Sequence, residues 1–309
     1  MHISEPTKKL AGKSIAKAIG LFRANALDQF WIRYRTVLLE LLKPLDRNSH
    51  KGHFGHVAVV EGDYKYQGAS RIVAKAALRV GSGLVSIVTR DAKSLHASDL
   101  PEYMKCDHKD AASLWPRVSA LVLGPGLGTT PAMLAYGQSL LEGTQTVIKS
   151  LVLDADGLRL LDEKKPLNFQ NLICTPHPKE AGLLLGVSSE TVENNRFLAI
   201  EALGRLTINT GSCTIWVLKG ATTLVYEKNA GIFAFEGSLP LLAVGGSGDL
   251  LAGAIAGLLP QALSPLAATL VAINLQIRAA LKAQKGASKG ILPSELADRF
   301  PSLLKRPSL

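Results

Sequence analysis

Cysteine, aromatic residues and long apolar runs are all scarce in this sequence of 309 residues. Its three cysteines, Cys106, Cys174 and Cys213, lie far apart without metal-ligand spacing, which is typical of reduced, buried thiols in a reducing compartment. No stretch approaches the roughly 18 uninterrupted apolar residues of a membrane-spanning helix, and residues 1–20 lack the apolar core and cleavage site of a secretory signal. The sequence thus predicts a soluble, cytoplasmic protein with no membrane partner.

Acidic residues are in deficit, most of all near the start of the chain. The 35 Lys and Arg residues exceed the 25 Asp and Glu residues, and residues 1–50 alone carry nine basic against four acidic side chains. No DNA- or RNA-binding motif accompanies the formal net charge of +10, and aromatic residues make up only 6% of the chain. We therefore expect no nucleic-acid partner. We predict a basic helical N-terminal arm at residues 1–49 and one domain at residues 50–309.

From about residue 55 onward, short apolar runs alternate with longer helical patterns. The alternation predicts an α/β fold with a mostly parallel sheet and crossover helices. The near-continuous apolarity of the short runs is typical of strands covered on both faces. The predicted strands are 56–62, 84–89, 119–124, 151–154, 171–175 and 214–220, and the clearest helical patterns are 69–80 and 192–206.

Four loops with unusual residues follow four of these predicted strands. They are GPGLG at 124–128, DADGL at 154–158, TPHPKE at 175–180 and KGATT at 219–223. Ligands in open α/β sheets bind outside the carboxyl ends of the strands, so we expect the four loops to line one cleft. Taken alone, GPGLG is neither a P-loop nor a dinucleotide fingerprint, and it fits a plain tight turn as well as a ligand contact.

The segment AVGGSGDLLAG at 243–253 combines a glycine-rich turn with one carboxylate. Glycines allow positive φ at the turn, and a helix that starts there presents unpaired N–H groups and a dipole that favour an anion. The turn is therefore suited to a transferring phosphoryl group. Asp249 is either a general base for an attacking hydroxyl or an ordinary carboxylate of the first helical turn.

Three further side chains in the strand-end loops have a functional and a plain interpretation. His177 is held between two prolines and is a candidate ligand contact. Glu180 is a candidate metal residue or a helix-start carboxylate. Lys219 can pair with a phosphate or with a surface carboxylate.

Together with HKGHFGHVAVVEGDYKYQGASRIVAKAALRVGSGLVSIVT (50–89) and PEYM (101–104), the loops resemble the ADP/ATP-dependent NAD(P)H-hydrate dehydratases, a branch of the ribokinase-like superfamily. KGxxG, GPGLG, DAD, TPHPxE, LKGAxT and GGSGDxLAG occur in that order across roughly residues 50–300. The resemblance implies a ribokinase-like fold with helices on both faces of a central, mainly parallel sheet. It also implies an enzyme of metabolite repair that phosphorylates the ring hydroxyl of hydrated NADH or NADPH, after which phosphate leaves and the double bond returns.

The same resemblance implies roles for individual residues. Asp249 would be the base, and the anion hole would be made by the N–H groups of Gly246, Ser247 and Gly248. The nucleotide, ADP or ATP, would lie along Lys219, Gly220, Ala221, Thr222, Thr223 and Gly248. The hydrated cofactor would contact Ala69, Gly126, His177 and Asp249. Glu180 would help to place Mg²⁺, through water, and relatives that are often tetrameric imply a homo-oligomer.

The chain departs from the family pattern in two places. Near the C-terminus, where the family usually has a His-Gly pair, the chain reads VAINLQIRAA at 271–280, so Asn274 or its neighbour replaces the histidine. Any contact made by that histidine is therefore in doubt. The arm is longer than the lead-in of a stand-alone dehydratase and too short for the epimerase domain fused ahead of many bacterial relatives.

Two alternative functions remain open from the sequence. The first is a ribokinase-like kinase of a small alcohol, such as a thiazole or pyrimidine vitamin precursor, which would share the glycine turn and yield a stable phosphorylated product. The second is a nucleotide-binding protein without turnover that acts on partners through its basic arm. The motifs report neither the choice between ADP and ATP nor that between hydrated NADH and NADPH.

Overall fold

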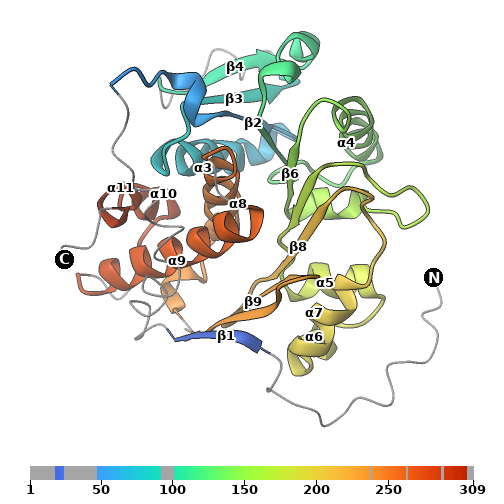
Figure 1. Cartoon of the computed structure of the whole chain (residues 1–309), viewed down its shortest axis with the longest axis vertical. Coiled ribbons are helices and arrows are strands. Elements are labelled where there is room, and N and C mark those ends of the chain that lie inside the picture. Colours follow the sequence, from blue (N-terminus) through green and yellow to red (C-terminus); the bar gives the residue numbers. More distant parts are fainter. Residues whose placement is uncertain are drawn as a thin grey trace.

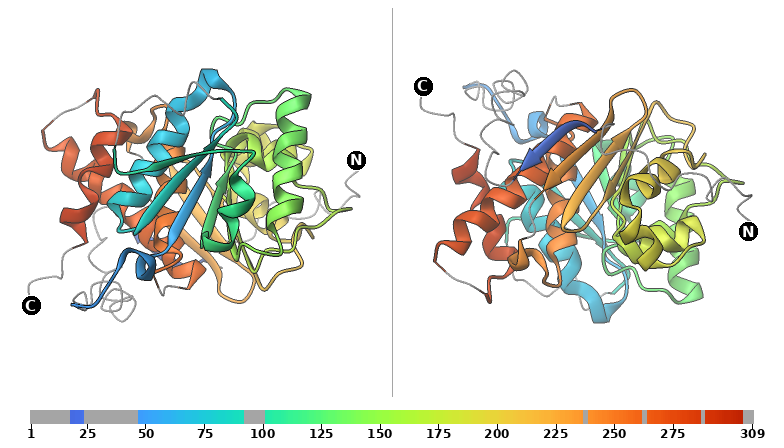
Figure 2. Two further views of the ribbon diagram at one scale, coloured as in Figure 1. Left: turned by 90° about the horizontal axis from the view of Figure 1, so that it is seen from above. Right: turned by 90° about the horizontal axis from the view of Figure 1, so that it is seen from below.

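The computed structural model describes the backbone of residues 18–23 and residues 47–91, 101–236, 239–261, 264–286 and 289–304. These residues form one ten-stranded sheet in the order β1-β10-β9-β8-β7-β6-β5-β2-β3-β4, with helices on both faces (Figures 1 and 2). The strands are β1 (Ala18–Arg23), β2 (His56–Val60), β3 (Leu84–Thr89), β4 (Met104–Asp107), β5 (Ala120–Leu123), β6 (Ser150–Leu153), β7 (Asn171–Cys174), β8 (Cys213–Leu218), β9 (Thr222–Glu227) and β10 (Gly231–Glu236).

The sheet is parallel except where β9 pairs with its two neighbours, β8 and β10. All six predicted strands are present, and every residue of β2, β5 and β6 is buried. Burial on both faces explains why these strands are continuous apolar runs rather than alternating ones. The predicted α/β fold with a mostly parallel sheet is confirmed.

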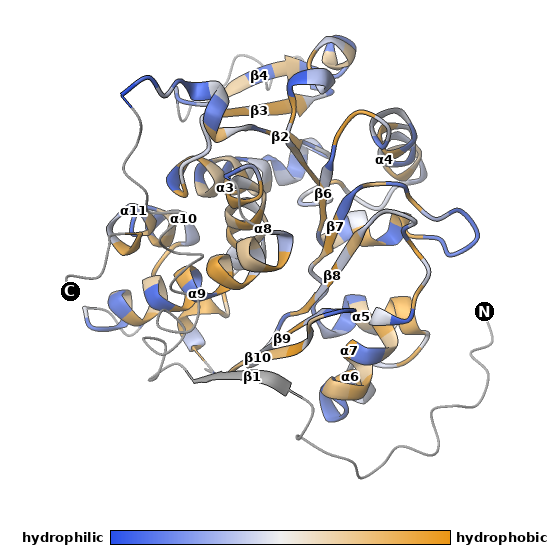
Figure 3. Cartoon of the chain, viewed as in Figure 1, coloured by the Kyte–Doolittle hydropathy of each residue, from blue (hydrophilic) through white to orange (hydrophobic). Residues whose placement is uncertain are grey.

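Two hydrophobic cores lie on the two faces of the sheet. One face is covered by α3 (Gln67–Arg79), α8 (Ser247–Leu258), α9 (Pro265–Gln284), α10 (Pro293–Ala297) and α11 (Phe300–Leu303). The other is covered by α4 (Pro131–Thr144), α5 (Pro178–Leu185), α6 (Ser189–Asn194) and α7 (Arg196–Gly204). Hydrophobic residues follow the strands, α8 and α9, whereas hydrophilic residues gather on the outer loops (Figure 3).

Helix α8 packs closely on α3 because two of its glycines leave room for the neighbouring backbone. A Cβ atom at Gly253 would lie 2.3 Å from the carbonyl oxygen of Val73, and one at Gly257 would lie 2.8 Å from the Cα atom of Ala77. Such distances exclude any side chain at either position without a shift of α3. The contact holds α8 against α3. The glycine turn lies at the N-terminal end of α8.

The helix predicted at 192–206 is wrong in one respect, because it is two helices. Asn195 interrupts it with φ −135° and ψ 45°, and its side-chain Nδ2 donates to the carbonyl oxygen of Thr191 at 3.1 Å. Asparagine competes for backbone groups in this way, which accounts for the break. The break starts α7 at Arg196, a residue that matters for the site below.

Of the predicted N-terminal arm, residues 1–49, the structure describes Ala18–Arg23, which form a strand rather than a helix, and residues 47–49. This strand, β1, pairs in parallel with β10 at the edge of the sheet. The other residues of the predicted helical arm lie outside the described part of the chain.

Helix α9 is the one helix among the described residues that is long and apolar enough to cross a membrane, by length and composition. In the structure, 78% of its most apolar window is buried against the rest of the fold. Burial of this extent is what the core helix of a large α/β domain requires.

Candidate active site

A pocket of about 620 Å³ opens at the carboxyl ends of β6, β7 and β8, facing the start of α8. Its polar lining comes from three of the four predicted loops, the glycine turn and α9: Asp154, His177, Glu180, Lys219, Gly220, Thr223, Ser247, Gly248, Asp249 and Gln276. Ala155, Ala221, Leu239, Pro240 and Leu242 supply most of the apolar lining. A small polar set in a largely apolar concavity is the usual make-up of a small-molecule site.

The glycine turn begins α8 as expected, but only one of its three glycines has positive φ. Gly246 is the N-cap residue, with φ 89°. Gly248 is needed for space instead, since a Cβ atom there would lie 3.1 Å from Lys219 Nζ. The N–H of Ser247 already donates to Val244, whereas those of Gly246 and Gly248 have no acceptor among the described residues. The N–H groups of the two glycines are therefore among the donors left for an anion.

Asp249 lies in the first turn of α8 and lines the pocket. Partial burial, followed by the nearby carboxylate of Asp154, raises its pKa to about 6, although Lys219 acts in the opposite direction. A carboxylate with this pKa is ionised at neutral pH and is a stronger base than an ordinary aspartate. The position therefore suits proton abstraction more than it suits a solvated helix-start carboxylate.

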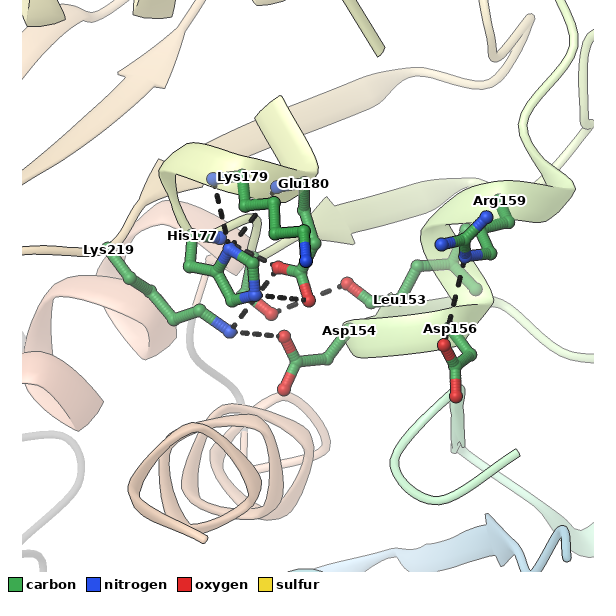
Figure 4. Close-up of polar contacts among 9 residues, drawn as sticks. Leu153, Asp154, Asp156, Arg159, His177, Lys179, Glu180 and Lys219 are labelled. Atoms are coloured by element: carbon green, nitrogen blue, oxygen red, sulfur yellow. Dashed lines mark hydrogen bonds and ion pairs between the residues drawn. The ribbon is translucent and has the colours of Figure 1, made fainter. Parts of the chain in front are cut away.

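Lys219 is surrounded by carboxylates (Figure 4). Its Nζ lies 2.5 Å from Asp154 Oδ1 and 4.0 Å from Glu180 Oε2. Burial alone would lower the pKa of Lys219, but the carboxylates of Asp154, Glu180 and Asp249 outweigh it and raise that pKa. Burial also raises the pKa of Glu180, against the influence of Lys219. Three acids share one ammonium group, so the pocket has an excess of negative charge that a bound cation would offset.

His177 and Glu180 form a reciprocal cap at the start of α5. His177 Nδ1 accepts from the N–H groups of Lys179 and Glu180, and Glu180 Oε2 accepts from the His177 N–H at 2.7 Å. The plain interpretation of Glu180 as a helix-start carboxylate is thus correct. Its oxygens also face the pocket, so the cap fixes the position of a group that remains available to a ligand.

Within the described ranges, no three His, Cys, Asp or Glu side chains are arranged to hold a metal by themselves. Mg²⁺ is often bound by one or two carboxylates, several waters and the phosphates of a substrate. The carboxylates of Glu180 and Asp154, both on the pocket wall, fit this kind of partial coordination.

Arg196 was not singled out by the sequence, yet it holds the β8–β9 loop in place. Its Nη2 donates to the carbonyl oxygens of Leu218, Lys219 and Thr222 at 2.8 to 3.0 Å. A Cβ atom at Gly220 would lie 2.7 Å from this guanidinium group, which explains the glycine. Thr222 contributes only its backbone carbonyl oxygen, which accepts from Arg196, and it does not line the pocket. Its neighbour Thr223 does line the pocket.

Asp154 was also missed as a site residue, although its loop was recognised. It is buried at the end of β6 and precedes Ala155, which has φ 48° and is the only non-glycine residue with positive φ in the described part of the chain. A strained backbone of this kind is costly and is found most often at functional sites.

Ala69 and Gly126 lie next to each other but outside this pocket. A Cβ atom at Gly126 would lie 3.3 Å from the Cβ atom of Ala69. Ile72, one turn further along α3, would meet a Cβ atom at Gly246 at 2.6 Å. The pair therefore lies beside α3, one helical turn from the residue of α3 that adjoins the glycine turn.

The polar residue of α9 that reaches the site is Gln276 rather than Asn274. Gln276 lines the pocket, and its Nε2 donates to the carbonyl oxygen of Ser247 at 2.7 Å. Asn274 is fully buried, and neither polar atom of its side chain has a partner in the described part of the structure. Gln276 therefore anchors the first turn of α8.

Comparison with known proteins places this geometry in a family. A profile of the NAD(P)H-hydrate dehydratase family matches residues 57–302. The bifunctional NAD(P)H-hydrate repair enzyme of Coxiella burnetii is 36% identical over 301 residues, which cover 94% of this chain and 59% of that enzyme. The chain therefore spans little more than half of that relative's length.

Two shorter proteins match over most of their own length. The ADP-dependent (S)-NAD(P)H-hydrate dehydratase of Neisseria meningitidis is 35% identical over 266 residues, covering 83% of this chain and 87% of that enzyme. The ADP/ATP-dependent NAD(P)H-hydrate dehydratase of Bacillus subtilis, co-crystallised with ATP and Mg²⁺, superposes with a TM-score of 0.73 at 26% identity, covering 94% of this chain and 98% of that one. The chain belongs to the NAD(P)H-hydrate dehydratase family.

Proposed function

We propose that this protein dehydrates the (S) form of hydrated NADH or NADPH, with ADP as the phosphoryl donor. The observation that carries the proposal is Asp249, a carboxylate with a pKa raised to about 6, at a glycine turn whose free N–H groups suit a phosphoryl group. The relatives named as ADP-dependent (S)-NAD(P)H-hydrate dehydratases support the substrate and the donor.

In the proposed reaction, Asp249 accepts the proton of the ring hydroxyl while that oxygen attacks the terminal phosphorus of ADP. The bond from that phosphorus to the oxygen of AMP breaks. The N–H groups of Gly246 and Gly248 donate to the phosphoryl oxygens, each contributing on the order of 3 kcal/mol to the transition state. The phosphorylated ring then expels phosphate with help from the nitrogen lone pair, and loss of a ring proton restores the double bond.

The remaining pocket residues hold the donor. Lys219 pairs with its phosphates, and the loop at Gly220, Ala221 and Thr223 lies along the nucleotide, next to the apolar wall from Leu239 to Leu242. Mg²⁺, when bound, would offset charge on the phosphates. Glu180 and Asp154 are the carboxylates placed to hold it, directly or through water.

The substrate side of the proposal involves Ala69, Gly126 and His177. Because Ala69 and Gly126 lie one helical turn from the residue of α3 that adjoins the glycine turn, a ring bound there would be close to Asp249. A cytoplasmic location and a homo-oligomeric assembly, such as a tetramer, are parts of the same proposal.

A small-alcohol kinase would use the same turn and the same base, so the site chemistry alone does not separate the two reactions. The family match over residues 57–302 favours the dehydratase. The raised pKa of Asp249 disfavours a nucleotide-binding protein without turnover. A carboxylate beside a bound phosphate weakens nucleotide binding, and a role as general base explains why one is there.

The test is an absorbance assay at the band of reduced nicotinamide, using acid-hydrated NADH, Mg²⁺ and either ADP or ATP. The proposal predicts a nucleotide-dependent rise in absorbance, faster with ADP. A flat trace with both donors, from protein shown to bind nucleotide by titration, would contradict it.

A further inference from the structure

A second pocket, of about 490 Å³, adjoins the first between η9 (Ala155–Leu160) and the start of α5. The two pockets share Ala155, His177 and Glu180. A ligand too large for the first pocket can therefore extend past His177 into the second.

The proposed reaction needs such an extension. Both a donor nucleotide and a hydrated dinucleotide must be bound, and a pocket of 620 Å³ is of the size that holds one drug-sized ligand. The adenosine half of the dinucleotide takes no part in the chemistry. It must therefore lie away from Asp249, on a surface that begins beside the reacting ring.

Two cationic side chains line the second pocket from opposite elements. Arg159 is on η9, and Lys179 is at the start of α5, with its side chain extending toward η9 (Figure 4). Within the described residues, the ammonium group of Lys179 has no ion-pair partner, and Arg159 has only a long contact, 3.8 Å, with Asp156.

The carboxylates of this pocket are already bonded. Asp156 Oδ2 accepts from the N–H of Gly128 at 3.0 Å, and Glu180 caps α5 through the His177 N–H. Lys179 has no ion-pair partner among the described residues, so its ammonium group is available to an anionic ligand, and Arg159 can join it by giving up its long contact with Asp156. A diphosphate between two ribose groups carries the negative charge that such a pair of cations binds.

The rest of the lining is apolar. Leu158, Leu161, Leu183 and Leu184 line the pocket, and Leu183 is 58% exposed. A flat base that packs on these leucines would cover that surface. Cationic side chains beside an exposed apolar wall form a surface suited to a nucleotide.

We propose that the second pocket binds the adenosine diphosphate portion of the hydrated dinucleotide, with Lys179 and Arg159 on its phosphates and the base against Leu183. The inference rests on the proposed function and names the part of the substrate that this chain recognises away from the reacting ring. His177 lies where the substrate passes from one pocket to the other.

The test compares two substrates in the variants Lys179→Gln and Arg159→Gln. One substrate is hydrated NADH, and the other is the hydrate of reduced nicotinamide mononucleotide, which lacks the adenylate half. Each variant is expected to raise the KM for the dinucleotide roughly tenfold, with kcat and the KM for ADP unchanged. The preference of the enzyme for the dinucleotide over the mononucleotide should shrink accordingly, and Lys179→Arg should restore it.

Arg205→Gln is the matched control. Arg205 is also an exposed arginine near a carboxylate, 3.7 Å from Glu201, but it lines a different pocket. It should leave both KM values unchanged. Thermal melting of every variant checks that a change in KM does not come from loss of fold.

The outcomes separate the inference from the function. If the unmodified protein regenerates NADH but the variants keep the full preference for the dinucleotide, the second pocket is not the adenosine site. If the KM for ADP rises instead, the pocket serves the donor, and the assignment is wrong. Failure of the unmodified protein on both hydrates would overturn the proposed function, and this inference with it.

Discussion

The two ends of the parallel sheet differ in the polar groups that they bury: neutral groups at the amino end and charged groups at the carboxyl end. At the amino end, the His56 side chain is buried, with the residue 5% exposed, and its Nε2 lies 2.8 Å from Ser86 Oγ. The backbone N–H of His56 donates to Ser119 Oγ. Burial, and then Arg117, lower the pKa of this histidine, so the ring stays neutral. At the carboxyl end, Asp154 and Lys219 are held as charges.

The comparison shows which end of the sheet buries groups at a cost in folding free energy. Neutral groups with hydrogen bonds are inexpensive to bury, whereas charges are costly unless they are paired. The carboxyl end holds three carboxylates against one ammonium group, together with a strained alanine and glycines that leave N–H groups free. Such an arrangement destabilises the empty protein and suits the binding of phosphates and a metal. We therefore propose that the amino end serves stability and the carboxyl end serves chemistry.

The largest effect expected from this difference between the two ends is a loss of turnover when the carboxylate of Asp249 is removed. Asp249→Asn should lower kcat roughly 10²-fold or more, because the base is lost. Nucleotide affinity should be kept or improved, since a negative charge is removed. Steady-state kinetics and a nucleotide titration measure both quantities. An Asn variant with near-normal turnover would remove Asp249 from the role of base.

The same substitution should stabilise the protein at neutral pH. The pKa of Asp249 is raised from 3.8 to about 6, so the folded state pays for its ionisation as pH rises through that range. Relative to the unsubstituted chain, Asp249→Asn should gain up to about 2 kcal/mol above pH 6 and nothing near pH 4. Urea unfolding at both pH values checks this. An equal gain at both would show that the ionised carboxylate is not strained by its site.

Within the glycine turn, replacement of two neighbouring glycines by alanine should affect stability and activity differently. Gly246→Ala places a Cβ atom 2.6 Å from Ile72 Cδ1 at φ 89°, and should cost about 1–2 kcal/mol and much of the activity. Gly245→Ala is the control, because a Cβ atom there meets nothing within 4 Å. Chemical unfolding and kcat are measured for both. Equal behaviour of the two variants would mean that the turn does not depend on the conformation of Gly246.

The smallest effect is expected at the amino end of the sheet. His56→Ala removes one buried hydrogen bond and leaves a small cavity, so it should lower the free energy of unfolding by about 1 kcal/mol. Its kcat and KM values should be unchanged. A fall in kcat at full occupancy of substrate would break the proposed division between the two ends.

Much of the fold follows from local sequence, and the predictions that succeeded were those with a local signal. The apolar runs at 56–62 and 171–175 are strands because burial on both faces requires continuous apolarity. The break at Asn195 was missed because it depends on one side-chain hydrogen bond within a pattern that is otherwise helical.

The pocket residues that the sequence singled out stand in motifs, whereas those that it missed make contacts with residues distant in the chain. Asp249 and Lys219 stand in recognisable motifs. Asp154 acts on Lys219 across 65 positions of sequence, and Gln276 holds Ser247 across 29. Arg196 donates hydrogen bonds to a loop more than 20 residues away in the sequence. No spacing rule connects such pairs before the sheet brings them together.

The central claim is that the carboxyl end of the sheet transfers a phosphoryl group to a ring hydroxyl and then expels it. The most direct measurement is the stoichiometry of the reaction with hydrated NADH and ADP, with AMP, inorganic phosphate and NADH quantified in one sample. The account predicts equal amounts of all three. AMP formed together with a lasting phosphorylated product, or phosphate released without NADH, would contradict it.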